Sequence, residues 1–350
     1  MNTISIGERG VDSKQPCYII AEAGVNHDGD MEIALRLIDA AAEAGADAVK
    51  FQTWAPGEIT GRFTNKVDYL EKTTAEEESR YELSARLAIP YSVHAGLKQR
   101  AEERGITFLS TPDGFQSLDF LADTIGMPVI KVGSTEITHL QFLEAVGRKK
   151  IPVILSTGLS TLGEVEKALD TLQRSGANDV TLLHCTSEYP APDVEMNLRA
   201  METLRNAFSV PVGLSDHSVG YEASIAATAM GASVIEKHFT LDRAHIGPDH
   251  AASMAPAEFT DLIISLRRVT AMMGDGIKTP TASESRNAAG IRRGVVAARA
   301  IGANTRLTAD MLTCKRPSGE IEPEHLKLCI GFVINRDLAE DEPLAWDDLR

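Results

Sequence analysis

Two lysines stand inside short apolar runs, where a charged side chain is costly to bury. Lys50 lies in DAVKFQ and Lys131 lies in PVIKVG. A buried ammonium group needs a carboxylate partner or an anion in front of it. One interpretation is therefore a salt bridge to Glu22 or Glu136. The other is a pair of cations that converge on a phosphate or carboxylate. Three hydroxyls would assist this second role: Thr111, Ser134 and Ser215.

Two histidines close neighbouring predicted strands, His217 in LSDHS and His238 in EKHF. A single histidine is more often a hydrogen-bonded core residue than a ligand. Two histidines at equivalent ends of adjacent strands could share one divalent metal and leave positions open for water and a substrate oxygen. Imidazole suits several first-row ions, so the spacing alone leaves open both the metal's presence and its identity.

The elements that must position these groups alternate along the chain. Eight short apolar runs rich in β-branched residues are separated by stretches with helical periodicity. Eight strand-helix units over about 260 residues predict a TIM (β/α)8 barrel, an α/β fold. A doubly wound open sheet remains the alternative. The runs are 17–21, 48–51, 106–109, 129–132, 153–155, 180–183, 210–214 and 233–236, and the helical stretches include 31–44, 118–124, 141–146, 162–174, 222–230 and 257–273.

The carboxyl ends of barrel strands form the active site in this fold. All eight predicted strands end in polar or ionisable residues, of which the lysines and histidines are the informative ones. In chain order these residues are Glu22; Lys50 and Gln52; Ser110 and Thr111; Lys131, Ser134 and Glu136; Ser156 and Thr157; His184, Thr186 and Ser187; Ser215, Asp216 and His217; and Glu236, Lys237 and His238.

The domain organisation follows from breaks in the pattern. Residues 54–90 are too long for one connection, so we expect this segment to be an insertion, here called the excursion, that extends over the barrel mouth. Its charged run AEEESR is typical of a solvated helix face. After the barrel (1–273), a small, polar stretch without hydrophobic period predicts a linker (274–290). Residues 291–350 predict a β-rich module. Its core is so small that its stability alone would be marginal, and contact with a partner surface would stabilise it.

Composition excludes several classes of protein. The 350 residues carry 35 Lys plus Arg against 50 Asp plus Glu, a formal charge of −15, which disfavours nucleic acid as a partner. The sequence has no apolar stretch of the roughly 20 residues that cross a bilayer and no Walker-type loop, so a small phosphorylated metabolite is favoured over a nucleotide. Four widely spaced cysteines and a polar start indicate a cytoplasmic protein without a disulfide framework or membrane partner.

Motifs in this order resemble the sialic acid synthase family. They are AEAGVNHDG (21–29), GADAVKFQT (45–53), FLSTP (108–112), KVGSTE (131–136), ILSTG (154–158), LLHCTSEYPAP (182–192), VGLSDHSVG (212–220) and EKHFTLDRAHIGPDHAASM (236–254). The resemblance continues through KRPSG (315–319) into the C-terminal module, which is known in this family as the antifreeze-like (SAF, β-clip) domain. It therefore covers nearly the whole chain.

The resemblance implies a TIM barrel with an antifreeze-like domain in a domain-swapped homodimer. It implies metal-dependent condensation of phosphoenolpyruvate with an N-acetylmannosamine-type N-acyl amino sugar, giving N-acetylneuraminate and phosphate. N,N'-diacetyllegionaminate synthesis from 2,4-diacetamido-2,4,6-trideoxy-mannose is the alternative, and pseudaminate synthesis ranks third because GPDH (247–250) looks like the other two branches. Two rivals from other classes are a carbohydrate-binding module on a barrel scaffold and an aldolase or hydrolase on the same barrel.

The resemblance also implies roles for individual residues. A divalent metal, usually manganese with magnesium or cobalt as alternatives, would be held by His217 and His238. Glu136 would lie near the reacting carbons and handle the proton of an attacking water. Phosphoenolpyruvate would contact Lys50, Thr111, Lys131, Ser134, Ser187 and Ser215. The sugar would contact Glu22, Gln52, Tyr189, Asp249 and Arg316, the last from the partner subunit. Two departures from the family pattern are Thr135, which could narrow the space beside Glu136, and Ser187, where some members carry Asn.

Overall fold

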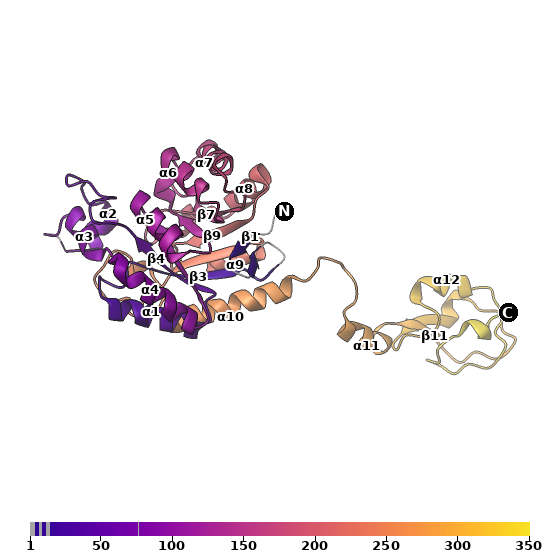
Figure 1. The fold of residues 1–350 in the computed structure, drawn as a ribbon. Helices are drawn as coiled ribbons and strands as arrows, with labels where there is room; N and C mark the ends of the chain where they lie inside the picture. Colours follow the sequence, from indigo (N-terminus) through magenta and orange to yellow (C-terminus); the bar gives the residue numbers. More distant parts are fainter. Residues whose placement is uncertain (1–3, 7–8, 12–14, 76) are drawn as a thin grey trace. The chain divides into compact units, whose positions relative to one another are not determined.

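The computed structural model describes residues 4–6, 9–11, 15–75 and 77–350. The chain divides into two compact units, Met1–Gly274 and Asp275–Arg350, and each is described by itself (Figure 1). In the part of the chain that the structure describes, no helix is both long enough and apolar enough to cross a membrane.

The first unit is a barrel of parallel strands surrounded by helices (Figure 1). The strands pair in the order β5-β4-β3-β10-β9-β8-β7-β6, and the two end strands, β5 and β6, lie beside each other. The sheet is therefore a near-closed barrel, which confirms the predicted TIM-type fold over the open sheet. The strands are β3 (Tyr18–Gly24), β4 (Ala48–Thr53), β5 (Thr107–Pro112), β6 (Ile130–Val132), β7 (Val153–Ser156), β8 (Val180–Cys185), β9 (Val212–Asp216) and β10 (Val234–His238).

Helices follow the strands and cover the barrel. Helix α1 matches the predicted 31–44 because Asp30 accepts hydrogen bonds from the first-turn N–H groups and Gly45 ends the helix in the left-handed region, at φ 90°. Two helices that the sequence did not indicate, α4 and α8, complete the ring. The helices are α1 (Met31–Ala44), α4 (His94–Glu103), α5 (Phe115–Asp119, continued by a wider π-type turn over Phe120–Ile125), α6 (Leu140–Arg148), α7 (Leu162–Ser175), α8 (Ala200–Phe208), α9 (Glu222–Ala229) and α10 (Pro256–Met273).

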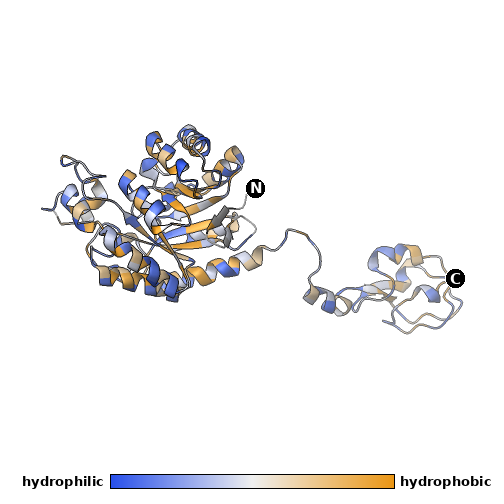
Figure 2. Cartoon of the chain, viewed as in Figure 1, coloured by the Kyte–Doolittle hydropathy of each residue, from blue (hydrophilic) through white to orange (hydrophobic). Residues whose placement is uncertain are grey.

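Strand registry brings three predicted site residues to one level. On β3, Glu22 pairs in register with Lys50 of β4 and with His238 of β10. Residues at the same level of adjacent parallel strands point to the same face of a sheet, so this face carries all three polar side chains. Apolar residues are concentrated in the strands (Figure 2), and a short hairpin of β1 (Ile4–Ile6) and β2 (Arg9–Val11) adds Ile6 and Val11 to the main core.

The excursion, residues 54–90, contains α2 (Asp68–Thr73) and α3 (Arg80–Leu87). The predicted charged run, 75–80, is not a helix face in its described part, and residue 76 lies outside the described residues. The run leads into α3, with Ser79 as the N-cap and Arg80 as the first helical residue. An apolar cluster anchors the excursion to the loop after β3, and its buried members are Val25, Trp54, Leu70, Leu83 and Leu87.

The second unit contains an antiparallel pair, β11 (Gly294–Ala297) and β12 (Leu312–Lys315), and a short helix, α12 (Leu326–Cys329). Its own buried core includes Val295, Ile321 and Ile334. The stretch predicted as a linker contains a helix, α11 (Ala282–Ile291), which Thr281 caps reciprocally with Glu284. No residue of α11 is buried, which explains why its sequence has no hydrophobic period.

Candidate functional site

A cavity of about 910 Å³ opens at the carboxyl ends of the strands. All the predicted site residues except Arg316 line it: Glu22, Lys50, Gln52, Thr111, Lys131, Ser134, Glu136, Ser187, Tyr189, Ser215, His217, His238 and Asp249. Arg316 is exposed in the second unit. Residues from both halves of the barrel sequence therefore converge on one pocket.

Lys50 is buried in the cavity base among acceptors. Its ammonium group forms an ion pair with Glu22, lies 3.6 Å from Glu236 Oε2 and donates a hydrogen bond to Thr111 Oγ1 at 3.1 Å. Burial alone would lower the pKa of Lys50, but Glu22 and Glu236 together raise it above its ordinary value. The predicted salt bridge between Lys50 and Glu22 is therefore present, and Lys50 also lines the cavity.

Lys131 is the second buried cation. Its ammonium group donates to Ser156 Oγ at 2.7 Å and lies 3.6 Å from Glu236 Oε1. The alternative of a Lys131–Glu136 pair is wrong, because the carboxylate beside Lys131 is Glu236. Burial lowers the pKa of Lys131, while the nearby carboxylate of Glu236 opposes that shift.

Glu236 links the two lysines; the sequence placed it among the polar strand ends but assigned it no role. Its Oε1 accepts a hydrogen bond from Ser215 at 2.9 Å. Burial would raise the pKa of Glu236, but Lys131 and Lys50 hold it at about 2. The signal for this residue is its spacing, since a residue two positions before His238 on one strand faces the same side.

Glu22 differs from Glu236 in the direction of its pKa shift. Burial raises the pKa of Glu22 to about 8, against the attraction of Lys50 and with a further push from Glu236. Of the two carboxyl groups beside Lys50, Glu22 therefore takes up a proton more readily.

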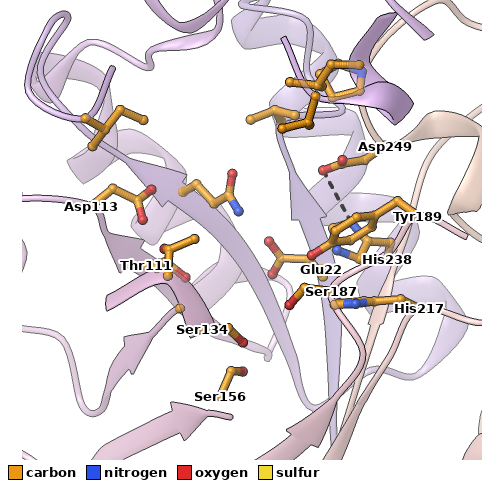
Figure 3. Close-up of a pocket in the computed structure, with 18 of the residues that line it drawn as sticks. Glu22, Thr111, Asp113, Ser134, Ser156, Ser187, Tyr189, His217, His238 and Asp249 are labelled. Carbon is orange, nitrogen blue, oxygen red and sulfur yellow. Dashed lines mark ion pairs between the residues drawn. The ribbon is translucent and has the colours of Figure 1, made fainter. Parts of the chain in front are cut away.

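The two histidines meet across neighbouring strands, with ring centroids 5.4 Å apart. Tyr189 lies over His217 at 4.3 Å between centroids, and Figure 3 shows these rings on the opposite side of the pocket from Thr111 and Asp113. Burial lowers the pKa of His217 to about 4, and burial together with His217 lowers the pKa of His238 well below its usual range. Both imidazoles are therefore neutral at pH 7.

The hydrogen bonds of these rings leave nitrogen lone pairs free. His217 Nδ1 lies 2.6 Å from the Thr186 carbonyl, which can only accept, so Nδ1 carries the proton and Nε2 a lone pair. Ser215 directs its hydroxyl hydrogen to Glu236 rather than to this Nε2. His238 Nδ1 is buried without a hydrogen-bond partner in the described residues, and Asp249 Oδ2 lies 3.5 Å from it. Neutral imidazoles held in this way, next to a carboxylate, fit a divalent metal.

Two more carboxyl groups lie on the opposite side of the cavity. Glu136 accepts a hydrogen bond from His139 Nδ1 at 2.8 Å. Asp113, which the sequence did not indicate because it lies beyond the end of β5, points into the pocket beside Thr111 (Figure 3). Burial, reinforced by the charge of Glu136, raises the pKa of Asp113 to about 7. These two carboxyl groups therefore lie on the side of the cavity away from His217 and His238.

The excursion supplies the apolar wall of the cavity. Every buried member of the apolar cluster lines the pocket, and Trp54 is fixed by a hydrogen bond from its indole N–H to the Ser84 carbonyl at 3.0 Å. The pocket therefore combines buried charged groups with an apolar wall, as small-molecule sites commonly do.

Comparison with known protein families gives two matches. Residues 37–278 match the NeuB family, and residues 292–350 match the SAF domain. The two matched segments span most of the barrel and most of the second unit.

Individual relatives are similar along nearly the full length. The N,N'-diacetyllegionaminic acid synthase of Campylobacter jejuni is 43% identical over 93% of this chain and 97% of its own length. A pseudaminic acid synthase from the same species is 32% identical over 99% of this chain and 100% of its own. Among solved structures, the N-acetylneuraminic acid synthetase of Leptospira borgpetersenii, in complex with citrate, has a TM-score of 0.72 and 34% identity over 82% of this chain and 95% of that one.

Proposed function

The chain belongs to the NeuB family, and on this premise we propose that it condenses phosphoenolpyruvate with an N-acyl amino sugar to a nine-carbon 2-keto acid and phosphate. The reaction joins the methylene carbon of phosphoenolpyruvate to the aldehyde carbon of the open-chain sugar. Water then adds to the former enol carbon, and the C–O bond to phosphate breaks.

The observation that carries this proposal is the convergence of Lys50 and Lys131 in the cavity base. The two buried ammonium groups flank Glu236 at 3.6 Å each, and hydroxyls of Thr111 and Ser156 contact them. Phosphoenolpyruvate carries a carboxylate and a phosphate on adjacent positions, and two cations can hold both groups at once. Such fixation of one reactant can contribute a large part of the rate enhancement.

The opposite side of the cavity would take the sugar. His217 and His238 would hold the divalent metal, manganese with magnesium or cobalt as alternatives, next to Asp249. A metal bound there supplies Lewis-acid polarisation of the aldehyde oxygen. Glu22, Gln52, Tyr189 and Asp249 would bind the sugar's polar groups.

Glu136 would handle the proton of the attacking water. Its carboxylate lines the cavity and is oriented by the hydrogen bond from His139. General acid-base groups need such fixed orientation within reach of the reacting atoms. Asp113 on the same side adds a second carboxyl whose pKa of about 7 allows it to exchange protons near neutrality.

Among the candidate sugars, we favour 2,4-diacetamido-2,4,6-trideoxy-mannose over N-acetylmannosamine. The relative named as a legionaminic acid synthase has higher identity than the relatives named for the other two products, which reverses the order that the resemblance alone implied. The favoured sugar has a methyl at C6 and a second acetamido methyl at C4. The apolar cluster of the excursion offers a surface for such groups.

We also propose that the site is completed within a homodimer. Arg316 belongs to the second unit, and its guanidinium would reach the sugar's N-acyl group in the partner's barrel. Co-expression of Arg316→Ala and His217→Ala chains would then form heterodimers with one intact site each. About a quarter of wild-type activity is the statistical expectation for two-fold symmetry. No recovery in verified heterodimers would refute the sharing.

The activity itself is tested by phosphate release with each substrate present or omitted. We expect release only when phosphoenolpyruvate and an amino sugar are both present, and a higher kcat/KM for the diacetamido sugar than for N-acetylmannosamine. Release from phosphoenolpyruvate alone would indicate a hydrolase, and no release with any amino sugar would contradict the proposal.

A further inference from the structure

A second group of histidines lies outside the cavity lining. His245 and His250 come from the loop between β10 and α10, and Asp28 comes from the turn between β3 and α1. One donor atom from each of the three lies within 4.8 Å of the others. None of the three lines the main cavity in the described residues, so the proposed reaction does not use this group.

Hydrogen bonds fix the orientation of the buried member, His250. Thr240 Oγ1 lies 2.7 Å from His250 Nδ1 and 3.2 Å from the Asp242 carbonyl oxygen. The shorter contact fixes the plane of the His250 ring. His250 Nε2 then points toward Asp28, 3.3 Å from Oδ1 and 3.2 Å from Oδ2.

Both imidazole rings of this group converge on the Asp28 carboxylate. His250 Nε2 can donate its proton to that carboxylate or, as the other neutral tautomer, direct its lone pair to a cation between the two groups. The position of His245 favours a cation, because its Nδ1 approaches the same Asp28 oxygen, Oδ2, at 3.7 Å and its ring lies 5.5 Å from that of His250 between centroids.

The backbone around the group is shaped to allow close approach. A Cβ atom at Gly247 would lie 2.7 Å from His250 Cδ2 and 3.2 Å from Asp28 Oδ1, so glycine is required there for space. Asp28 itself has a positive φ of 53°, a strained conformation for a residue other than glycine. His245 is half-exposed while His250 is buried, so solvent can reach the group from one side.

We propose that Asp28, His245 and His250 form a divalent metal site separate from His217 and His238. Two imidazole nitrogens and one carboxylate, with an open side for water, are a donor set that zinc and other first-row ions accept. The ion would join the β3–α1 turn to the loop that carries Asp249, the neighbour of His250, and so fix one edge of the cavity. This inference does not depend on the proposed reaction.

The test counts zinc bound to the full-length, tag-free chain after dialysis against buffered Zn²⁺, by elemental analysis. In a His217→Ala/His238→Ala background, we expect one zinc per chain. Adding His245→Ala should reduce the count to zero. The control is His325→Ala, which replaces a partly exposed histidine of the second unit and should leave the count at one. Co²⁺ in place of Zn²⁺ should give a visible absorption band that His245→Ala removes.

Two results would overturn the site: no zinc in the double-alanine background, or a count that His245→Ala leaves unchanged. If that background does not fold, as judged by circular dichroism, the same comparison is made in the unaltered chain. There, His245→Ala should lower the zinc count by one. A count that falls with His217→Ala alone and never with His245→Ala would place the metal only in the main cavity.

Discussion

Replacement of Lys131 by Met tests the anion-binding role of the cavity base. Met is nearly isosteric but carries no charge, so the change removes the ammonium that donates to Ser156 at 2.7 Å and faces Glu236 at 3.6 Å. A hydrogen bond to a charged group contributes about 1.5–3 kcal/mol. If that contact is transferred to phosphoenolpyruvate in the transition state, kcat/KM for phosphoenolpyruvate should fall roughly 10- to 150-fold.

A second buried lysine provides the matched control. Lys237 is as buried as Lys131 but faces away from the cavity, where it pairs with Asp216 at 3.1 Å and donates to the Ser218 carbonyl at 2.9 Å. Lys237→Met should lower the melting temperature without a specific loss in kcat/KM for phosphoenolpyruvate. The assay is initial-rate phosphate release against phosphoenolpyruvate at saturating sugar. Wild-type kinetics for Lys131→Met, or the same loss for both variants, would show that the Lys131 ammonium group does not bind phosphoenolpyruvate.

Three further predictions concern pH and the excursion. Burial lowers the pKa of His27 to about 4, so below about pH 6.5 the unfolded state takes up a proton that the folded state excludes. The free energy of unfolding should therefore fall by about 2 kcal/mol from pH 7 to pH 5, and urea titrations of His27→Asn should lack this component. Because the pKa of Asp113 is raised to about 7, its carboxyl becomes anionic as the pH rises through 7, so KM for phosphoenolpyruvate should rise there, and Asp113→Asn should abolish the change. A Cβ at Gly114 would lie 2.1 Å from the Glu58 carboxylate, which accepts from Ala55 N and Gln116 N; Gly114→Ala should therefore release the excursion and increase its protease cleavage, and equal cleavage rates in both chains would contradict this role.

The barrel was predictable because its signals are local. The eight runs are short, apolar and rich in β-branched residues, and each became a barrel strand. Helix α1 carries its own start and stop in Asp30 and Gly45. Helices α4 and α8 escaped prediction because few of their residues are buried: His94, Leu97 and Ala101 in α4, and Met201 and Leu204 in α8.

Most residues that line the cavity were predictable from the sequence, but their pairing was not. Strand ends indicate which side chains enter the pocket, and Lys50, Lys131 and His238 do line it, whereas Asp113 follows the end of its strand and was missed. The partner of Lys131 could not be read in the same way. Glu236 approaches it from β10, which is not a neighbour of β6 in the sheet order, and contacts across a barrel depend on tilt and side-chain length.

The bridging oxygen of phosphoenolpyruvate reports directly on which bond breaks in the proposed reaction. Phosphoenolpyruvate labelled with ¹⁸O between C2 and phosphorus is incubated with the enzyme, manganese and the diacetamido sugar, and both products are analysed by mass spectrometry. C–C condensation with C–O cleavage predicts labelled phosphate, an unlabelled 2-keto acid nine carbons long in its backbone, and equal amounts of the two. Unlabelled phosphate, or phosphate formed without the nine-carbon acid, would contradict the proposed reaction.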